Sequence, residues 1–419
     1  MSGLDADLPE GMSGLDDWKY LPEGPLRSIV AQLGLASAED LLSFAATCHS
    51  WNSAFSVSLP TFPPLLLQLD IPPCPLPQPY LGNKKVPNCQ CLVTDITKPN
   101  KIAHLCHEIP PLGPQECFIG ASYGHLIWSS DRKCSVMDMF AGFTLSSPQL
   151  PEGAELNYGA LTAPTRSPNS CLIVDTGEQN LFWRVGSKSW ASCSTRYGTV
   201  KQIVVFKGQV FGMDSDRRLF KVELTPEISI HEVPVMQSSM INICELSIAW
   251  LVACGDMLLL VGWSVPTVVS GVTFEVFRLD LSTEPALWLK MEKLDNWAIF
   301  ISTDKRSQAL SCKNPQIWGG KSNHTYCYNH ESKSCIALEM GKPLQGDGSE
   351  SNSNYMGCDS KMQPMWLVPS MLSLCGSDGE VLDGWLMYLV FRSLYCRVEV
   401  KKKKNWHHSS KFTGADFDF

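Results

Sequence analysis

A Gly-x-Ser-x-Gly sequence, the motif that carries the nucleophilic serine of many hydrolases, occurs at Gly120-Ala-Ser122-Tyr-Gly124. In those enzymes a sharp turn between a strand and a helix exposes the serine oxygen for attack on a carbonyl carbon. Here residues 125–130 have the pattern of a β-strand, and no alternating strand–helix pattern surrounds the motif. We therefore expect the two glycines to form a turn between strands, and we expect the chain to be non-catalytic.

A cluster of cysteine and histidine residues could bind zinc. Its members are Cys89, Cys91, His104, Cys106 and His107. Structural zinc sites usually place two to four residues between paired cysteines, whereas a single residue separates the first two here. The chain contains 17 cysteines, and a reduced cysteine packs as a small apolar residue. Glycine patterns that bind nucleotide phosphates are also missing. The sequence therefore predicts no metal and no cofactor.

The charge pattern limits the possible partners. The formal net charge is −8, and the densest basic run is Lys401–Lys404 near the C-terminus. A protein that follows a phosphate backbone needs positive potential over its binding surface, so we expect no nucleic-acid partner. The lysine run is read as solvated chain or as a nuclear import signal. With no apolar stretch of membrane-spanning length, we expect a soluble intracellular protein, cytoplasmic, nuclear or both, with no membrane partner.

Residues 18–57 have the pattern of three short helices behind an acidic, flexible N-terminus at residues 1–17. A second helix begins after Ser37, whose spacing to Asp40 suits a capping box. Three helices in about 40 residues gain stability by burying an apolar face against a partner. The apolar positions of the first helix recur at i, i+3, i+4 and i+7, and those of the third at i, i+3 and i+7: Leu26, Ile29, Val30 and Leu33, then Cys48, Trp51 and Phe55.

The rest of the chain reads as a linker, a β-rich body and a tail. Nine prolines make residues 58–88 an extended linker, and residues 371–419 form an extension that carries the basic run. Between them, residues 89–370 show short strands separated by turn signals such as Lys207-Gly208. This length suits a β-propeller of about six or seven blades. The clearest predicted strands are 125–128, 171–174, 181–185, 202–206, 209–213, 219–224, 257–261 and 274–279.

The helical segment resembles an F-box, the module that docks onto the Skp-type adaptor of a cullin ubiquitin ligase. The resemblance implies a multidomain α+β chain, with a small three-helix F-box followed by an all-β propeller. It also implies that the helical face binds the Skp-type adaptor. The residues that carry the resemblance, and that it makes the adaptor-binding face, are Leu21, Pro22, Leu26, Ile29, Leu33, Leu41, Cys48 and Trp51.

The β-rich body resembles the KIB-type propeller of plant F-box proteins. The resemblance implies a substrate-recognition adaptor of a Skp-cullin-F-box ubiquitin ligase, which binds an unidentified protein target through the propeller. The alternative is a propeller scaffold or inhibitor that binds a protein without any ligase. The matching segments, in chain order, are Ile119–Gly124, Met137–Gly142 with Leu150-Pro151, Leu251–Val261, Phe274–Asp280, Trp288–Ile301, His324–Tyr328 and Trp366–Pro369.

Overall fold

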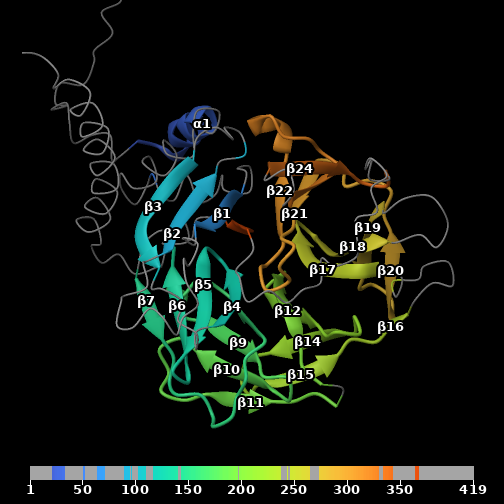
Figure 1. The fold of residues 1–419 in the computed structure, drawn as a ribbon. Helices are drawn as coiled ribbons and strands as arrows, with labels where there is room; N and C mark the ends of the chain where they lie inside the picture. The colour runs from blue at the N-terminus through green and yellow to red at the C-terminus, as the bar shows by residue number, and fades with distance from the viewer. Residues whose placement is uncertain are drawn as a thin grey trace, which may run out of the picture. The chain divides into compact units, whose positions relative to one another are not determined.

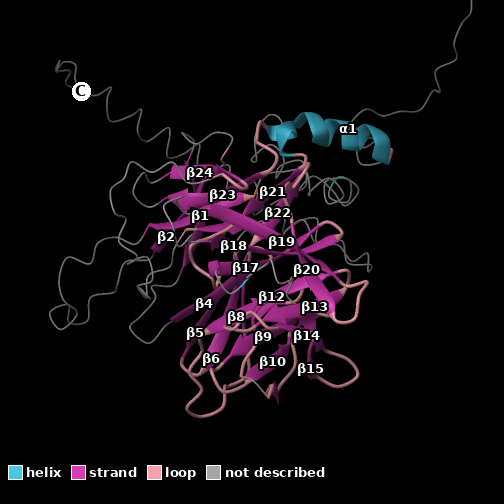
Figure 2. Cartoon of the chain, turned by 90° about the vertical axis from the view of Figure 1, so that its right-hand side faces the viewer, coloured by secondary structure: helices cyan, strands magenta, loops and turns pink. Residues whose placement is uncertain are grey.

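The computed structural model divides the chain into two compact units. One comprises residues 59–376, and the other comprises residues 1–58 together with 377–419. The second unit contains α1 (Glu23–Leu33), drawn in cyan in Figure 2, and the first contains the β-strands, drawn in magenta. The structure describes residues 21–33, 51, 64–70, 89–94, 96, 102–109, 117–139, 143–196, 198–236, 243, 246–264, 273–329, 334–342 and 364–367.

The unit 59–376 is a β-propeller of six sheets arranged in a ring, as Figure 1 shows. We number these blades along the chain and give the strands of each from the ring centre outward. Blade 1 contains β25 (Met365–Leu367), β1 (Leu65–Asp70), β2 (Cys89–Thr94) and β3 (Ile102–Ile109). Blade 2 contains β4 (Cys117–Ser122), β5 (His125–Ser130), β6 (Lys133–Asp138) and β7 (Thr144–Ser146). Blade 3 contains β8 (Tyr158–Leu161), β9 (Cys171–Asp175), β10 (Asn180–Arg184) and β11 (Ala191–Cys193).

The other three blades complete the ring. Blade 4 contains β12 (Lys201–Phe206), β13 (Gln209–Met213), β14 (Leu219–Glu223) and β15 (Ser229–Glu232). Blade 5 contains β17 (Leu246–Cys254), β18 (Met257–Ser264), β19 (Thr273–Asp280), β20 (Ala286–Lys290) and β16 (Val235–Met236). Blade 6 contains β22 (Leu310–Lys313), β21 (Trp297–Phe300), β23 (His324–Asn329) and β24 (Ser334–Glu339), with the 3-10 helix η5 (Pro315–Trp318) after β22.

Tight turns with left-handed backbone connect the strands within a blade. Tyr123 and Gly124 have φ of 50° and 74° between β4 and β5, and Lys207 and Gly208 have φ of 49° and 74° between β12 and β13. Two consecutive positive φ values match the right-handed twist of the strands that such a turn joins. Both predicted turns are therefore confirmed, but of the two glycines in the Gly-x-Ser-x-Gly motif only Gly124 lies in the turn, because Gly120 is part of β4.

The hydrophobic core lies between neighbouring blades rather than in one central mass. Phe206, Phe277 and Trp288 belong to the cluster between blades 4 and 5, and Ile119 and Trp183 belong to the cluster between blades 2 and 3. Since each sheet is covered on both faces by its neighbours, its strands carry long buried runs, such as all five residues of β9. The propeller therefore has a series of cores between its blades instead of one central core.

Blades 5 and 6 depart from simple antiparallel order. β16 leaves blade 4 and pairs in parallel with β20 at the outer edge of blade 5. In blade 6 the chain enters at β21, turns back to form the innermost strand β22, and then places β23 parallel to β21. The segment between β21 and β22, residues 301–309, is thereby brought to the centre of the ring.

The two ends of the propeller meet in blade 1. β25 pairs antiparallel with β1, with Trp366 opposite Leu66. The Trp366 ring lies edge-on against Phe300 of blade 6 with the ring centroids 5.0 Å apart, and its Nε1 donates a hydrogen bond of 2.8 Å to the carbonyl oxygen of Ile301. One buried side chain thus joins the last strand of the propeller, in blade 1, to the neighbouring blade 6.

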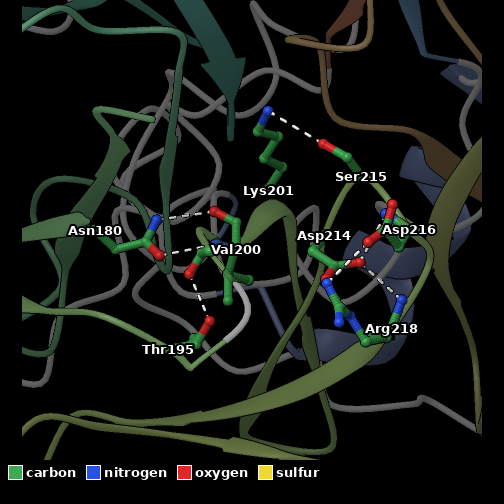
Figure 3. Close-up of polar contacts among 9 residues, drawn as sticks. Asn180, Thr195, Val200, Lys201, Asp214, Ser215, Asp216 and Arg218 are labelled. Carbon is green, nitrogen blue, oxygen red and sulfur yellow. Dashed lines mark hydrogen bonds and ion pairs between the residues drawn. The ribbon is translucent and has the colours of Figure 1, made fainter. Parts of the chain in front are cut away.

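Side-chain amides tie neighbouring blades together. Asn180 of blade 3 donates to the carbonyl oxygen of Val200 and accepts from its N–H, both at 2.8 Å, as Figure 3 shows. Gln202 of blade 4 makes the same pair of contacts with blade 5, at 2.8 Å to the carbonyl oxygen of Ala249 and 3.1 Å from the N–H of Leu251. Each amide therefore bridges two blades through a pair of backbone contacts, and that of Gln202 joins the innermost strands β12 and β17.

The predicted strands are confirmed, since each overlaps an observed one, and the blade number is six. The sequence also predicts five tryptophans as blade core: Trp128, Trp183, Trp288 and Trp366 are buried, whereas Trp190 is half-buried. One boundary differs from the prediction. Residues 65–70 fall inside the predicted linker 58–88, yet they form β1 of blade 1, because an apolar run between prolines can still pair at a blade. The propeller therefore begins before residue 89, while the predicted second helix and the tail 371–419 lie outside the described residues.

We predict that Trp366→Ala will lower the free energy of unfolding by about 3–5 kcal/mol, because it removes a large buried ring and a hydrogen bond from the closing strand. Chemical denaturation of the full chain measures this change. Ile317→Ala, at a side chain that is 40% exposed, is the control and should change stability little. An equal effect of the two substitutions would contradict the closing role of Trp366.

We also predict that Asn180→Ala will destabilise the chain by about 2 kcal/mol or more, since it leaves the N–H and the carbonyl of Val200 buried without their partner. The matched control is Asn157→Ala, at an exposed asparagine that precedes β8 in the same blade. Thermal unfolding of both variants gives the comparison. If the two variants unfold at the same temperature, the amide does not join the blades.

Candidate functional site at the centre of the propeller

A hollow at the ring centre, which we name the central hollow, brings together three innermost strands and the segment 301–309. Its volume is ≈ 10 Å³, which is room for about one water molecule. Blades 3, 4 and 5 contribute from β8, β12 and β17, and no two of these strands are neighbours in the sequence. The lining residues are Tyr158, Gln202, Ile203, Trp250, Leu251, Lys305, Ser307, Gln308 and Ala309.

The segment 301–309 is anchored at both sides of Lys305. The buried carboxylate of Asp304 accepts hydrogen bonds from Arg306 N at 3.0 Å, Nε at 2.9 Å and Nη2 at 2.7 Å. Arg306 Nη1 also donates to the carbonyl oxygen of Phe118 at 2.8 Å, and its guanidinium lies 4.9 Å from the centroid of that ring. Ala121 of β4 then exchanges backbone hydrogen bonds with Arg306 and Gln308. These contacts therefore fix the segment against blade 2, and they set the position of Lys305.

A close approach of backbones supports this arrangement at blade 2. A Cβ atom at Gly120 would lie 1.8 Å from the carbonyl oxygen of Gly159 in blade 3, and 3.3 Å from that of Arg306. Contacts this short are impossible for any residue with a side chain, so glycine is required at position 120. The first glycine of the Gly-x-Ser-x-Gly motif is thus explained by packing at the ring centre.

Three cationic side chains gather at this end of the ring. Burial lowers the pKa of Lys305, and the nearby charges of Arg217 and Lys201 lower it further. The ammonium is exposed to water, so the surrounding protein removes only part of its hydration. Among the residues that the structure describes, no carboxylate forms an ion pair with Lys305. The site therefore holds cations together against their mutual repulsion.

Acidic residues on the rim fix the other cations. Lys201 Nζ lies 3.6 Å from Asp175 Oδ2 and 3.3 Å from Ser215 Oγ. Asp214 accepts hydrogen bonds from the backbone N–H groups of Asp216 and Arg218 at 2.9 and 2.8 Å, and it holds Arg218 Nε at 2.7 Å. Figure 3 shows the contact of Lys201 with Ser215 and the contacts of Arg218 with the neighbouring aspartates. Asp214 therefore shapes the turn between β13 and β14 that carries Arg217.

Two buried donors in the central hollow have no acceptor within the described part of the chain. Trp250 Nε1 and Ser307 Oγ are both without a hydrogen-bond partner there, and each residue is 2% exposed. A buried donor left unpaired costs about 1–3 kcal/mol, so native proteins satisfy nearly all of them. These two donors are therefore polar groups of the ring centre that the rest of the described chain leaves unsatisfied.

The Ser122 motif has no exposed nucleophile. Ser122 is 2% exposed, and its Oγ accepts a hydrogen bond of 2.8 Å from Leu161 N. His125 directs its ring nitrogens to the Tyr123 carbonyl oxygen at 2.8 Å and to Thr165 Oγ1 at 2.9 Å. Burial lowers the pKa of His125, although Asp138, 3.7 Å away, favours its protonated form. These polar residues form a buried hydrogen-bonded joint between blades 2 and 3.

The residues predicted for adaptor binding lie in the other unit. Leu26 is buried, and Leu21, Ile29 and Trp51 are half-buried. Pro22 is exposed, and Leu33 is the last residue of α1. Leu41 and Cys48 lie outside the described residues. Sequence reasoning did not select Trp250, Lys305 or Ser307; the one local signal was the polar run 302–306 directly after a buried strand.

Two other kinds of feature, a metal site and a membrane-spanning helix, are not found among the described residues. They contain no group of three or more His, Cys, Asp or Glu side chains placed to hold a metal ion. The cysteines and histidines between residues 89 and 107 lie on the paired strands β2 and β3. Within the same residues, no helix has the length and apolar character needed to cross a membrane.

Solved structures with some similarity to this chain include three from varied proteins. The tricorn protease is 11% identical over 48% of this chain and 20% of its own, with a TM-score of 0.27. PorZ of Porphyromonas gingivalis is 9% identical over 63% and 32%, with a TM-score of 0.29. The allergen Mala s 1 of Malassezia sympodialis is 10% identical over 60% and 80%, with a TM-score of 0.31. This chain thus spans a third or less of the first two, and similarities at this level carry no conclusion about it.

The family comparison is more specific. A search of curated protein sequences found no match to this chain. The model of the KIB1-4 beta-propeller family matches residues 96–352, which is more than half of the 419 residues. This range contains all the strands of blades 2 to 6, and it agrees with the resemblance seen in the sequence. The chain belongs to the KIB1-4 β-propeller family.

Proposed function

We propose that this chain is the substrate-recognition adaptor of a Skp-cullin-F-box ubiquitin ligase of the plant type. In this proposal the propeller binds a protein target, and the N-terminal helices dock onto the Skp-type adaptor and through it onto a cullin. The chain itself is non-catalytic, because ubiquitin transfer belongs to the conjugating partner. It works in the cytoplasm, the nucleus or both, and it needs no metal or cofactor.

The propeller supplies the binding half of this proposal. A β-propeller is a rigid scaffold whose connecting loops can vary without loss of the fold, and such loops are where binding residues concentrate. The amides of Asn180 and Gln202 join neighbouring blades. A protein-binding scaffold of this kind can present a target in one fixed orientation.

The helix α1 is the observation that supports docking onto the Skp-type adaptor. Its residues Leu26 and Ile29 fall on one face, with Leu26 1% exposed and Ile29 half-buried. The intervening Arg27 and Ser28 are exposed. This is the pattern of a helix that packs an apolar stripe inward and leaves its margin, here Ile29, available to a partner.

Bridging two partners explains how such a chain could act without chemistry of its own. Binding a target on one unit and a ligase on the other raises the effective concentration of target lysines near the conjugating enzyme. The two compact units match these two tasks.

We predict that the full chain will co-purify with a Skp-type adaptor and that Ile29→Asp will weaken this binding by about tenfold or more. A carboxylate at the margin of the stripe would have to lose its hydration on docking. Isothermal titration of the two proteins measures the affinity. Ile29 is the better probe than Leu26, since an aspartate at a fully buried site would also disturb the helix.

The control is Ser28→Asp, which places the same charge on the neighbouring exposed position. It should leave the affinity within about twofold of the wild type. Failure of the wild-type chain to bind the adaptor would reject the ligase proposal. The alternative, a propeller scaffold or inhibitor that works without a ligase, would then take its place.

A further inference from the structure

A buried histidine joins blade 2 to the β8–β9 loop (residues 162–170) of blade 3. His125 is 1% exposed, its Nδ1 lies 2.8 Å from the carbonyl oxygen of Tyr123, and its Nε2 lies 2.9 Å from Thr165 Oγ1. A carbonyl oxygen can only accept a hydrogen bond, so Nδ1 carries the proton of the neutral ring. Nε2 of that ring is then an acceptor, and the Thr165 hydroxyl donates to it. The contact between the blades therefore has the polarity that suits an uncharged imidazole.

The β8–β9 loop keeps its shape through its own hydrogen bonds and is attached to blade 2 by side chains. Ser167 N donates to the carbonyl oxygen of Pro164 at 2.9 Å, and Ser170 N donates to that of Ser167 at 3.0 Å. Thr165 is buried against His125, while the guanidinium of the exposed Arg166 lies 5.3 Å from the ring centroid of Phe143 in blade 2. Loss of these attachments would therefore free the loop and leave the strands beside it paired.

The charged and titratable groups that face His125 come from three elements. Asp138 of β6 has its Oδ2 3.7 Å from Nε2, Arg166 belongs to the β8–β9 loop, and Tyr123 lies in the turn between β4 and β5. Burial raises the pKa of Tyr123 to about 12, so this side chain stays neutral. Burial lowers the pKa of His125; Asp138 opposes that effect in part, and Arg166 adds to it. The closed joint therefore disfavours the imidazolium.

A proton on Nε2 would disturb the contact that holds the loop. Nε2 would become a donor, so the Thr165 hydroxyl would have to turn and accept, and a second positive charge would lie near Arg166 in a site that burial has largely dehydrated. Opening of the loop would hydrate the imidazolium and let Arg166 move away, while Asp138 would stay with blade 2. Because the closed form has a pKa below the ordinary value of about 6.5, its stability is complete above that pH and is lost as the pH falls below it.

We propose that the β8–β9 loop separates from blade 2 when His125 takes up a proton, which makes this loop of the propeller acid-sensitive. Connecting loops are where a rigid scaffold presents its binding residues, so the surface offered to a partner would differ between neutral and mildly acidic solution. The inference goes beyond the proposed function and does not depend on it, because every group involved lies in blades 2 and 3.

The test is hydrogen–deuterium exchange of the full-length chain at pH 7.5 and pH 5.5, with rates corrected for the intrinsic effect of pH. In the wild type, the amides of Ser167 and Ser170 should lose protection by about threefold to tenfold in acid. Tenfold is about the limit for uptake of one proton at one pH unit below 6.5. The hairpin of β12 and β13 is the internal control and should keep its protection. An NMR titration of the histidine side chains should place the pKa of His125 below 6.5.

Three substitutions make the comparison specific. His125→Gln keeps an acceptor within reach of Thr165 but cannot become charged, so it should abolish the acid-dependent loss of protection. Arg166→Gln removes the nearby cation and should make that loss about twofold smaller. Because Arg166 also packs on Phe143, the ratio of protection at the two pH values is compared rather than its absolute level. Lys188→Gln, at an exposed lysine of the same blade, removes an equal charge and should behave as the wild type.

The proposal would be overturned by unchanged protection of the loop in the wild type, by an equal loss in His125→Gln, or by titration of His125 above pH 6.5. If His125→Gln does not fold, the pair Arg166→Gln and Lys188→Gln decides, since both positions are exposed. An equal acid-dependent loss in these two variants would reject the role of His125. Adaptor binding by the same preparations tests the proposed function separately.

Discussion

The pairing of β25 with β1 is the contact on which the rest of the propeller depends. It joins Met365–Leu367 to Leu65–Asp70 and completes blade 1 from segments almost 300 residues apart in the chain. Each blade is stabilised only by its two neighbours, because the apolar clusters lie between sheets. An open ring would leave one face of blade 1 and one face of blade 6 in water. The side chain of Trp366 packs between these two faces and covers both of them.

Closure also creates the candidate site, because the ring centre belongs to no single blade. Lys305 reaches it from the segment between β21 and β22, and Trp250 from β17. Their positions are set by cross-blade contacts, among them the amide of Gln202 and the contact of Arg306 with Phe118. A site built in this way is rigid as long as the ring is closed. Its unpaired donors and crowded cations are then a stable feature of the folded chain.

The sequence predicted what local rules determine and missed what depends on distant contacts. Lys207-Gly208 and the strands that follow it were predictable, because a turn with two positive φ values and alternating apolar residues leave local signals. The strand β1 was placed in a linker, since its apolar run lies between prolines and its partners lie elsewhere in the chain. The parallel pairing of β21 with β23 has no local signal either. Trp250, within an apolar strand, looks like core until Ser307 is brought beside it.

The central claim is that the N-terminal helix binds a ligase adaptor independently of the propeller, which is left free for a target. The most direct measurement is titration of a Skp-type adaptor onto the wild-type chain and onto Trp366→Ala, whose substitution lies in the closing strand of the propeller. Since α1 and the propeller belong to different compact units, the account predicts equal affinities for the adaptor. Loss of adaptor binding in Trp366→Ala would mean that the adaptor binds the propeller, and it would contradict the bridging account.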